Sequence, residues 1–158
     1  MTTTSYAIAL GSNRPGRHGG PRDEVIAALA ALPGVRAVSP IIVTPPLGPS
    51  IRAFANAAAL VDSPLDPPAM LAQLKAIERR FGRRRGQRWG ARVIDLDIIL
   101  WSGGLWRSPG LAVPHPAYAV RDFVLEPLAA IAPDWRDPRD GRWIRHLRHG
   151  VDRRRPRA

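Results

Sequence analysis

The chain has 158 residues, long enough for one domain with its own core, and carries a formal net charge of +11 at pH 7. It contains no cysteine, which excludes disulfide bonds and thiolate metal sites. We find neither a signal-peptide pattern nor an apolar run of membrane-spanning length, so we expect a cytoplasmic protein with no membrane partner.

The first part of the chain predicts a strand, a helix and two more strands. Alternating apolar residues at 6–10 favour a strand. A helical stripe follows at 21–32, beginning with a proline and two acidic residues and ending at a Pro-Gly pair. Residues 35–44 read as a strand that is interrupted at Pro40, because proline has no backbone N–H to donate. Residues 54–62 indicate the third strand.

The second part predicts a helix and a fourth strand. Asp66 is a suitable N-cap, and apolar residues follow it at helical spacing, namely Met70, Leu71, Leu74, Ile77 and Phe81. Residues 82–90 have no periodicity, so we expect a mobile loop there, and residues 93–100 read as the strand. The chain beyond should add a short hairpin, loops and a further helix.

This order of elements, β-α-β-β-α-β, is typical of a ferredoxin-like α/β sandwich. We therefore predict an α+β fold in which one antiparallel sheet carries both helices on one face. Residues 1–150 would form a single domain. Residues 151–158 are rich in arginine and would form a basic, disordered tail.

Two aspartates lie inside the most strand-like apolar run of the chain. Because side chains alternate along a strand, Asp95 and Asp97 should share one face, and Ile94, Leu96 and Ile98 the other. Two carboxylates so close repel each other unless a cation lies between them. The simpler alternative is an edge strand whose charged face is solvated.

The neighbouring sequence favours a cation site. Six arginines lie in residues 79–88, and Arg92 is nearer still. Paired carboxylates suit Mg²⁺, while guanidinium groups suit phosphate oxygens. Together they point to phosphoryl transfer from a nucleotide. The Gly-rich phosphate-binding loop of the P-loop enzymes is absent from the sequence.

Several short motifs are weak when taken singly. The string T-P-P-L-G at 44–48 could be an ordinary turn, and His115 in V-P-H-P could be a hydrogen-bonded loop residue. In order along the chain, however, G-S-N, T-P-P-L-G, F-x-N, R-W-G-x-R-x-x-D-L-D-I-I, V-P-H-P and R-x-F closely resemble the 6-hydroxymethyl-7,8-dihydropterin pyrophosphokinases of folate biosynthesis. The resemblance extends from about Tyr6 to Pro133.

The resemblance implies a ferredoxin-like monomer that transfers pyrophosphate from ATP to the hydroxymethyl group of the pterin and releases AMP. It implies that Asp95 and Asp97 bind two Mg²⁺ ions, and that Arg83 and Arg92 take part in catalysis. The residues that it implies for ATP binding are Glu78, Arg85, Arg88, Trp89, Arg92, Ile98, His115 and Arg121. Those that it implies for the pterin are Thr44, Pro45, Leu47, Phe54, Asn56, Trp89, Asp95 and Phe123.

The sequence departs from the family pattern at a few positions. Phe54 stands where many relatives have tyrosine, and Gly110 and Ala112 replace polar residues that contact ATP in some members. Lys75 and Pro116 differ likewise. These departures leave open a catalytically impaired relative with a binding role.

The positive charge offers another reading, because a ferredoxin-like sheet with basic loops is also a common RNA-binding architecture. The charge is almost all arginine, which a GC-rich coding sequence would also produce. Asp95 and Asp97 would repel a phosphate backbone in the absence of metal, and no RNP-like aromatic motif is present. We therefore expect no nucleic-acid partner.

Overall fold

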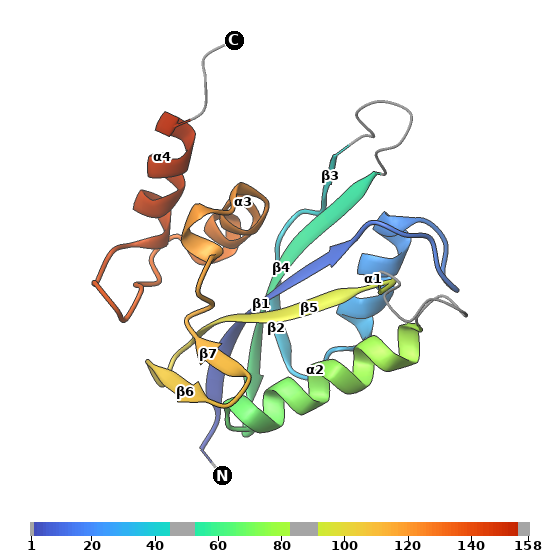
Figure 1. Ribbon diagram of the computed structural model, residues 1–158, viewed down its shortest axis with the longest axis horizontal. Coiled ribbons are helices and arrows are strands. Elements are labelled where there is room, and N and C mark those ends of the chain that lie inside the picture. The colour runs from blue at the N-terminus through green and yellow to red at the C-terminus, as the bar shows by residue number, and fades with distance from the viewer. Residues whose placement is uncertain (1, 45–52, 83–91, 155–158) are drawn as a thin grey trace.

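The computed structural model describes the backbone of residues 2–44, 53–82 and 92–154 (Figure 1). Its main sheet is antiparallel, and β1 (Thr4–Ser12) lies at its centre. β1 pairs with β4 (Phe54–Ser63) on one side and with β5 (Asp95–Trp101) on the other. β2 (Val35–Val38) and β3 (Ile42–Thr44) both pair with the outer edge of β4. This is the strand arrangement expected for the predicted fold.

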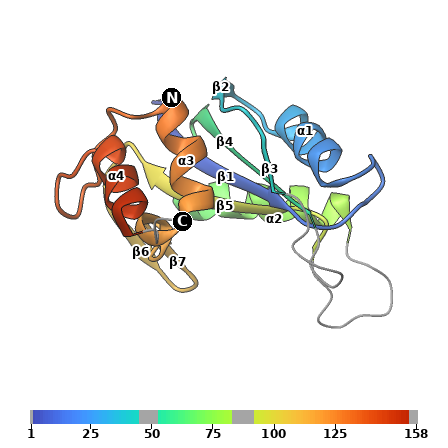
Figure 2. The same ribbon diagram turned by 90° about the horizontal axis from the view of Figure 1, so that it is seen from above.

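Helices pack on both faces of the sheet. α1 (Pro21–Ala31) and α2 (Pro67–Phe81) pack on one face, over a core that includes Ile8, Leu96 and Ile98. The opposite face packs against α3 (Asp122–Ile131), over Ala58, Leu60 and Ile99 among others. Figure 2 shows α1 and α3 on either side of the strands. The prediction of two helices on one face is confirmed, and the third helix covers part of the other.

The second predicted helix begins and ends as its sequence indicates. The Oδ1 of Asp66 accepts a hydrogen bond from the N–H of Ala69 at 3.0 Å and so caps α2. Gly82 follows the helix with a φ of +89°, a conformation that L side chains rarely adopt. The apolar stripe between them faces the sheet, with Met70 and Leu74 fully buried.

The predicted interruption at Pro40 separates β2 from β3. Ser39 compensates for the break, because its N–H donates to the carbonyl of Ala58 at 2.9 Å and its hydroxyl oxygen accepts the N–H of Ala58 at 2.8 Å. Both strands can therefore pair with β4 without leaving these buried backbone groups unsatisfied.

The C-terminal part contains the expected hairpin, formed by β6 (Trp106–Ser108) and β7 (Leu111–Val113), and the expected helix α3. Another helix, α4 (Ile144–Arg154), packs beside α3 and was not predicted. It extends four residues into the segment expected to be a disordered tail, which corrects that expectation for residues 151–154. The helix was missed because its sequence is rich in Arg and His and has no continuous apolar stripe. Ile144 and Leu147 are among the few apolar residues on its buried side. In the described parts of the chain, no helix has the length and apolar character needed to cross a membrane.

Candidate active site

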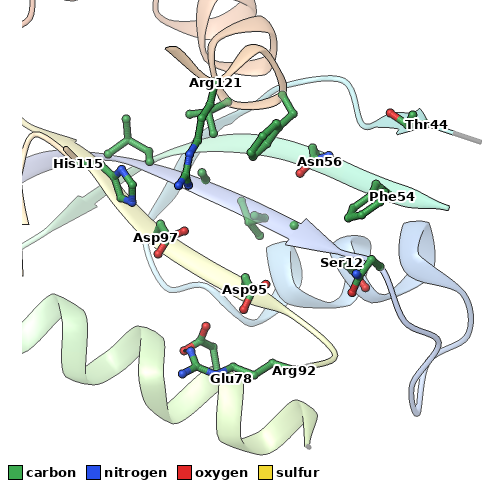
Figure 3. Close-up of a pocket in the computed structure, with 17 residues that line it drawn as sticks. Ser12, Thr44, Phe54, Asn56, Glu78, Arg92, Asp95, Asp97, His115 and Arg121 are labelled. Carbon is green, nitrogen blue, oxygen red and sulfur yellow. Dashed lines mark hydrogen bonds and ion pairs between the residues drawn. The ribbon is translucent and has the colours of Figure 1, made fainter. Parts of the chain in front are cut away.

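A cavity of about 730 Å³ opens on the sheet face that α3 only partly covers (Figure 3). Its floor is formed by the second half of β1, the first half of β4 and the first half of β5. α2 contributes Glu78 at one side, and the segment from His115 to Val124 forms the other. Residues far apart in the sequence are thus brought together by the pairing of three antiparallel strands.

The paired aspartates lie on the floor of this cavity. Asp95 and Asp97 both line it, whereas Leu96 and Ile98 point into the core beneath α1 and α2. The expected alternation is therefore confirmed. Burial, followed by the charges of Glu78 and Asp97, raises the pKa of Asp95 above its ordinary value. A cation between the two carboxylates would remove this repulsion.

These side chains fit Mg²⁺ by their chemistry. Asp95 and Asp97 provide hard oxygen ligands on one surface, as Mg²⁺ requires. Among the residues that the structure describes, no group of three or more His, Cys, Asp or Glu residues could hold a metal ion. Mg²⁺ commonly uses one or two carboxylates and takes its other ligands from water and phosphate, so a pair is sufficient when a nucleotide is bound.

Glu78 connects α2 to the aspartate strand. Its carboxylate is 4% exposed, and Oε2 accepts the backbone N–H of Leu96 at 3.1 Å. Oε1 accepts a hydrogen bond from Nη1 of Arg92 at 2.9 Å and lies 3.3 Å from Nζ of Lys75. The buried charge is therefore paired, and Arg92 is held at the edge of the cavity beside Asp95.

Two exposed aromatic rings line the cavity opposite Glu78. Phe54 is 41% exposed and Phe123 is 52% exposed, so both rings leave apolar surface open to a ligand in the cavity. Asn56, two residues after Phe54 on β4, and Thr44 at the end of β3 complete this side. The arrangement suits a flat ring with polar edges, since the phenylalanines offer stacking and Asn56 offers both a donor and an acceptor.

His115 and Arg121 line the cavity above Asp97 (Figure 3). The N–H of His115 donates to the carbonyl of Ile99 at 2.9 Å, and its Nδ1 accepts the N–H of Ala117 at 3.2 Å. Burial, with the positive charge of Arg121, lowers the pKa of His115 despite the opposing effect of Asp97. With Nδ1 acting as an acceptor, the neutral ring carries its proton on Nε2 and can donate it to an anion.

Most of the predicted site residues that fall within the described chain do meet in this cavity. They are Thr44, Phe54, Asn56, Glu78, Arg92, Asp95, Asp97, His115, Arg121 and Phe123. Six others lie outside the described residues, namely Pro45, Leu47, Arg83, Arg85, Arg88 and Trp89.

The side chain of Ile98 does not line the cavity, because it is 4% exposed and packs in the core beneath α1 and α2. Burial of the side chain leaves its backbone groups free to contact a nucleotide, so the assignment of Ile98 to ATP binding stays a prediction. Its neighbour Ile99 lines the cavity instead. The pairing of β1 with β5 shifts register here, because Ile8 faces Ile98 while Ala7 faces Leu100. The extra residue in β5 is Ile99.

The end of β1 also belongs to the cavity, although its residues were not among the predicted site residues. Gly11, Ser12 and Asn13 all line the cavity. A Cβ on Gly11 would lie 3.0 Å from Oδ1 of Asn56, so a side chain there would crowd the amide. Ser12 donates a hydrogen bond to the carbonyl of Val93 at 2.7 Å, which joins β1 to the residues before Asp95. The G-S-N motif that contributed to the resemblance was the available signal.

Comparison with known proteins shows the family to which the chain is similar. Residues 7–133 match the family model described as 7,8-dihydro-6-hydroxymethylpterin-pyrophosphokinase. The chain is 46% identical over 146 residues to the 2-amino-4-hydroxy-6-hydroxymethyldihydropteridine pyrophosphokinase of Pseudomonas aeruginosa, covering 89% of this chain and 87% of that protein. It is 40% identical over 133 residues to the Bacillus subtilis protein of the same name, covering 83% and 79% of the two chains.

A solved structure shares the fold. The crystal structure of Plasmodium falciparum HPPK-DHPS with pteroate superposes with a TM-score of 0.72 at 15% identity. The match covers 97% of this chain but 43% of the Plasmodium chain, so this protein spans less than half of that one. At this identity the likeness shows the fold alone.

Proposed function

Because the chain belongs to the 7,8-dihydro-6-hydroxymethylpterin-pyrophosphokinase family, we propose that it transfers a diphosphate group from ATP to 6-hydroxymethyl-7,8-dihydropterin. The products are AMP and the pterin diphosphate, and the reaction is a step of tetrahydrofolate biosynthesis. The observation that carries this proposal is the placement of Asp95 and Asp97 in one cavity with two exposed phenylalanines. In this proposal, a site for metal-bound phosphates would lie next to a site for a flat ring.

Asp95 and Asp97 would hold Mg²⁺ at the floor of the cavity. When bound there, Mg²⁺ would neutralise phosphate charge and ease loss of the hydroxyl proton. Glu78 supports this arrangement through the backbone, since it accepts the N–H of Leu96, the residue between the two aspartates. The carboxylates are then presented by a strand whose position is fixed from the helix side.

The pterin would lie between Phe54 and Phe123, stacked on their rings. Asn56 can donate to and accept from the polar edge of the ring, and Gly11 leaves room for its amide, since a Cβ there would lie 3.0 Å from Oδ1. In this position the hydroxymethyl group would point along the cavity floor toward Asp95. The stacking surface lets the site hold the reacting oxygen in one orientation.

The phosphates would lie among Arg92, His115 and Arg121, which surround the aspartates. Arg92 keeps hydrogen-bonding capacity beyond its bond to Glu78, because a guanidinium has five N–H donors. His115 would donate from Nε2 without adding a full charge, and Arg121 would supply one. Negative charge that moves onto the leaving AMP would be stabilised by donors already in place.

The test is a direct product analysis. The protein is incubated with ATP, Mg²⁺ and 6-hydroxymethyl-7,8-dihydropterin, and nucleotides and pterins are separated by chromatography. We expect AMP and the pterin diphosphate in equal amounts. Asp97→Asn should abolish both products, while Asp140→Asn, a change at a surface ion pair with Arg142, should not. Formation of ADP would show a simple kinase and would overturn the proposal, as would the absence of turnover.

A further inference from the structure

The segment that carries His115 and Arg121 has little regular structure of its own. It connects β7 to α3 and contains a single turn of 3-10 helix at Tyr118–Val120. Its start is attached to the sheet by one backbone hydrogen bond, from His115 to Ile99. Two residues that line the phosphate side of the cavity therefore lie at the ends of a short irregular segment. Its end at Arg121 is joined to α3, because the carbonyl of Arg121 accepts the N–H of Leu125 at 3.0 Å.

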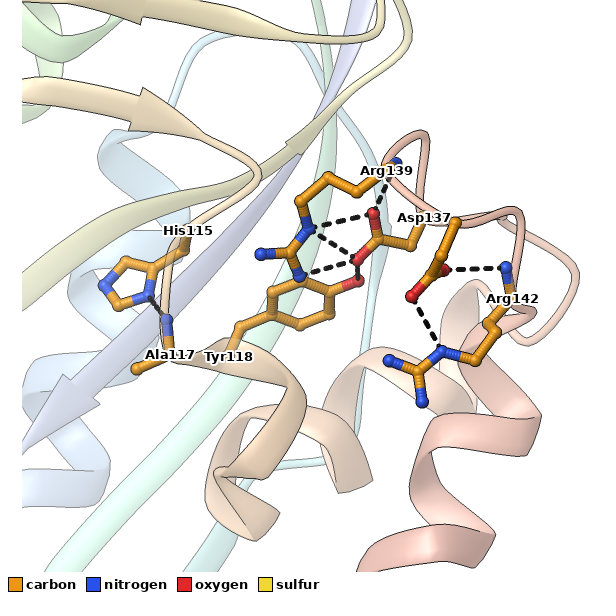
Figure 4. A network of polar contacts seen from close by, with 7 residues as sticks. His115, Ala117, Tyr118, Asp137, Arg139 and Arg142 are labelled. Atoms are coloured by element: carbon orange, nitrogen blue, oxygen red, sulfur yellow. Dashed lines mark hydrogen bonds and ion pairs between the residues drawn. The ribbon is translucent and has the colours of Figure 1, made fainter.

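Tyr118 lies midway between these two residues. Its N–H donates to the carbonyl of His115 at 3.4 Å, and its carbonyl accepts the N–H of Arg121 at 3.1 Å. Its side chain is fully buried, and the hydroxyl donates to Oδ2 of Asp137 at 2.6 Å (Figure 4). The backbone from His115 to Arg121 is therefore hydrogen-bonded to Tyr118, whose side chain is anchored by Asp137.

Asp137 belongs to the connection between α3 and α4, and it is fully buried as well. Arg139 holds its carboxylate with its backbone N–H at 2.8 Å and with Nη2 at 2.8 Å. The N–H of Asp137 donates to the carbonyl of Arg142 at 2.8 Å. Although burial alone would raise the pKa of Asp137, the bonds from Arg139 and Tyr118 lower it, so this acceptor is charged.

Neither Tyr118 nor Asp137 belongs to the cavity lining, so neither can contact a substrate in it. We propose that Tyr118 and Asp137 are positioning residues, which hold His115 and Arg121 in place for the nucleotide through the hydrogen bond between them. This inference rests on the proposed function. It gives the C-terminal part of the chain, beyond the catalytic sheet, a role in nucleotide binding.

The geometry makes the effect specific for one substrate. Phe123, on the pterin side, lies in α3, which is held against the sheet by the apolar side chains of Val124, Leu125 and Leu128. That contact does not use the Tyr118 hydroxyl. Loosening the segment should therefore weaken ATP binding and leave the pterin side in place, whereas a general loss of structure would affect both substrates.

The chain provides a matched control. Its two tyrosines are both fully buried, and each donates its hydroxyl to one acceptor. Tyr6 donates to the carbonyl of Leu65 and packs in the core beneath α1 and α2, away from the cavity. Tyr6→Phe and Tyr118→Phe therefore remove the same atom from equally buried places. Asp137 keeps its pairing with Arg139 in Tyr118→Phe, so this variant leaves no buried charge unpaired.

The first measurement is steady-state kinetics with each substrate varied in turn. For Tyr118→Phe we expect the KM for ATP to rise by about threefold to tenfold, with the KM for the pterin within about twofold of the parent. Tyr6→Phe should leave both values unchanged. An unchanged KM for ATP in Tyr118→Phe, or an equal rise for both substrates, would overturn the inference.

The second measurement needs no turnover. In ¹⁵N-histidine spectra at fixed pH, with the His115 signals assigned from His115→Gln, the parent should show Nδ1 as acceptor and the proton on Nε2. The ¹⁵N chemical shifts of the His115 ring should change in Tyr118→Phe and should not change in Tyr6→Phe. Identical chemical shifts in the parent and both variants would overturn the inference. If the parent protein is inactive, that result counts against the proposed function. The histidine spectra would still show whether Tyr118 positions His115, because they need no turnover. If Tyr118→Phe does not fold, Asp137→Asn, which weakens the same bond, replaces it.

Discussion

The carboxylate of Glu78 accepts the backbone N–H of Leu96 at 3.1 Å, and Leu96 is the residue between Asp95 and Asp97. A helix residue thus fixes the strand that presents the candidate metal ligands. The same carboxylate accepts a hydrogen bond from Arg92, which lines the same cavity. One buried charge therefore orients both the acidic and the basic parts of the site.

Glu78→Ala should lower the free energy of unfolding by about 2 kcal/mol, because it leaves the buried N–H of Leu96 without a partner. Glu78→Gln keeps an acceptor for that N–H, so its loss of stability should be smaller. Urea denaturation measures both. The control is Glu126→Ala, which removes a half-exposed partner of Arg148 and should cost less than about 0.5 kcal/mol. Equal losses in the free energy of unfolding for Glu78→Ala and Glu126→Ala would contradict the claim that Glu78 stabilises the strand at Leu96.

Asp95→Asn and Asp97→Asn should each reduce kcat by at least about a thousandfold, which corresponds to about 4 kcal/mol in the barrier. Each change removes a charged ligand for Mg²⁺ while it keeps the shape of the side chain. Both variants should fold, since these side chains face the cavity and leave the core intact. Activity within about tenfold of the parent, measured as AMP release, would show that the carboxylates do not hold the metal.

Phe123→Ala should weaken pterin binding by about 1–2 kcal/mol, or roughly tenfold in the dissociation constant, because one stacking surface is lost. Titration calorimetry with the pterin measures this. Val120→Ala is the matched control, since Val120 is 63% exposed close to Phe123 in sequence but does not line the cavity. Phe54→Tyr keeps an aromatic ring and should bind the pterin as the parent does. Unchanged affinity in Phe123→Ala would place the pterin elsewhere.

The stability contributed by Asp137 should depend on pH. Its pKa is lower in the folded protein than its ordinary value of 3.8, so folding favours the carboxylate. This contribution is complete well above pH 3.8 and is lost as the pH falls below 3.8 through the pKa of the folded state. At pH 6 we expect Asp137→Asn to be less stable than the parent by about 1–2 kcal/mol.

The difference between the two proteins should narrow as the pH is lowered toward 2, because protonated Asp137 resembles asparagine in charge. Urea denaturation at pH 6, 4 and 2.5 measures this trend. Asp140→Asn, at an exposed ion pair, should follow the parent at all three values. A constant difference between Asp137→Asn and the parent would show that the carboxylate is not the favoured form in the folded state.

Local periodicity was sufficient to predict the main sheet and two of its helices. The alternation at residues 94–98 placed both aspartates on one face, and the Asp66 cap and apolar stripe predicted α2. These features depend on neighbours in the sequence, because side-chain direction in a strand or helix follows from backbone geometry alone. α4 escaped prediction because its buried side is narrow and its other residues are mostly charged.

The sequence by itself determined which residue types were available, namely the paired carboxylates, the arginines and the phenylalanines. It also determined the order of the strands that carry them. Only the tertiary structure decided which of them meet. The register shift in β5 put Leu100 on the same face of the sheet as Ile99, and Asp137 reached Tyr118 across 19 residues of chain. Such outcomes depend on strand pairing and on the packing of distant segments. Both are stabilised by contacts between residues far apart in the sequence, which local sequence patterns do not reveal.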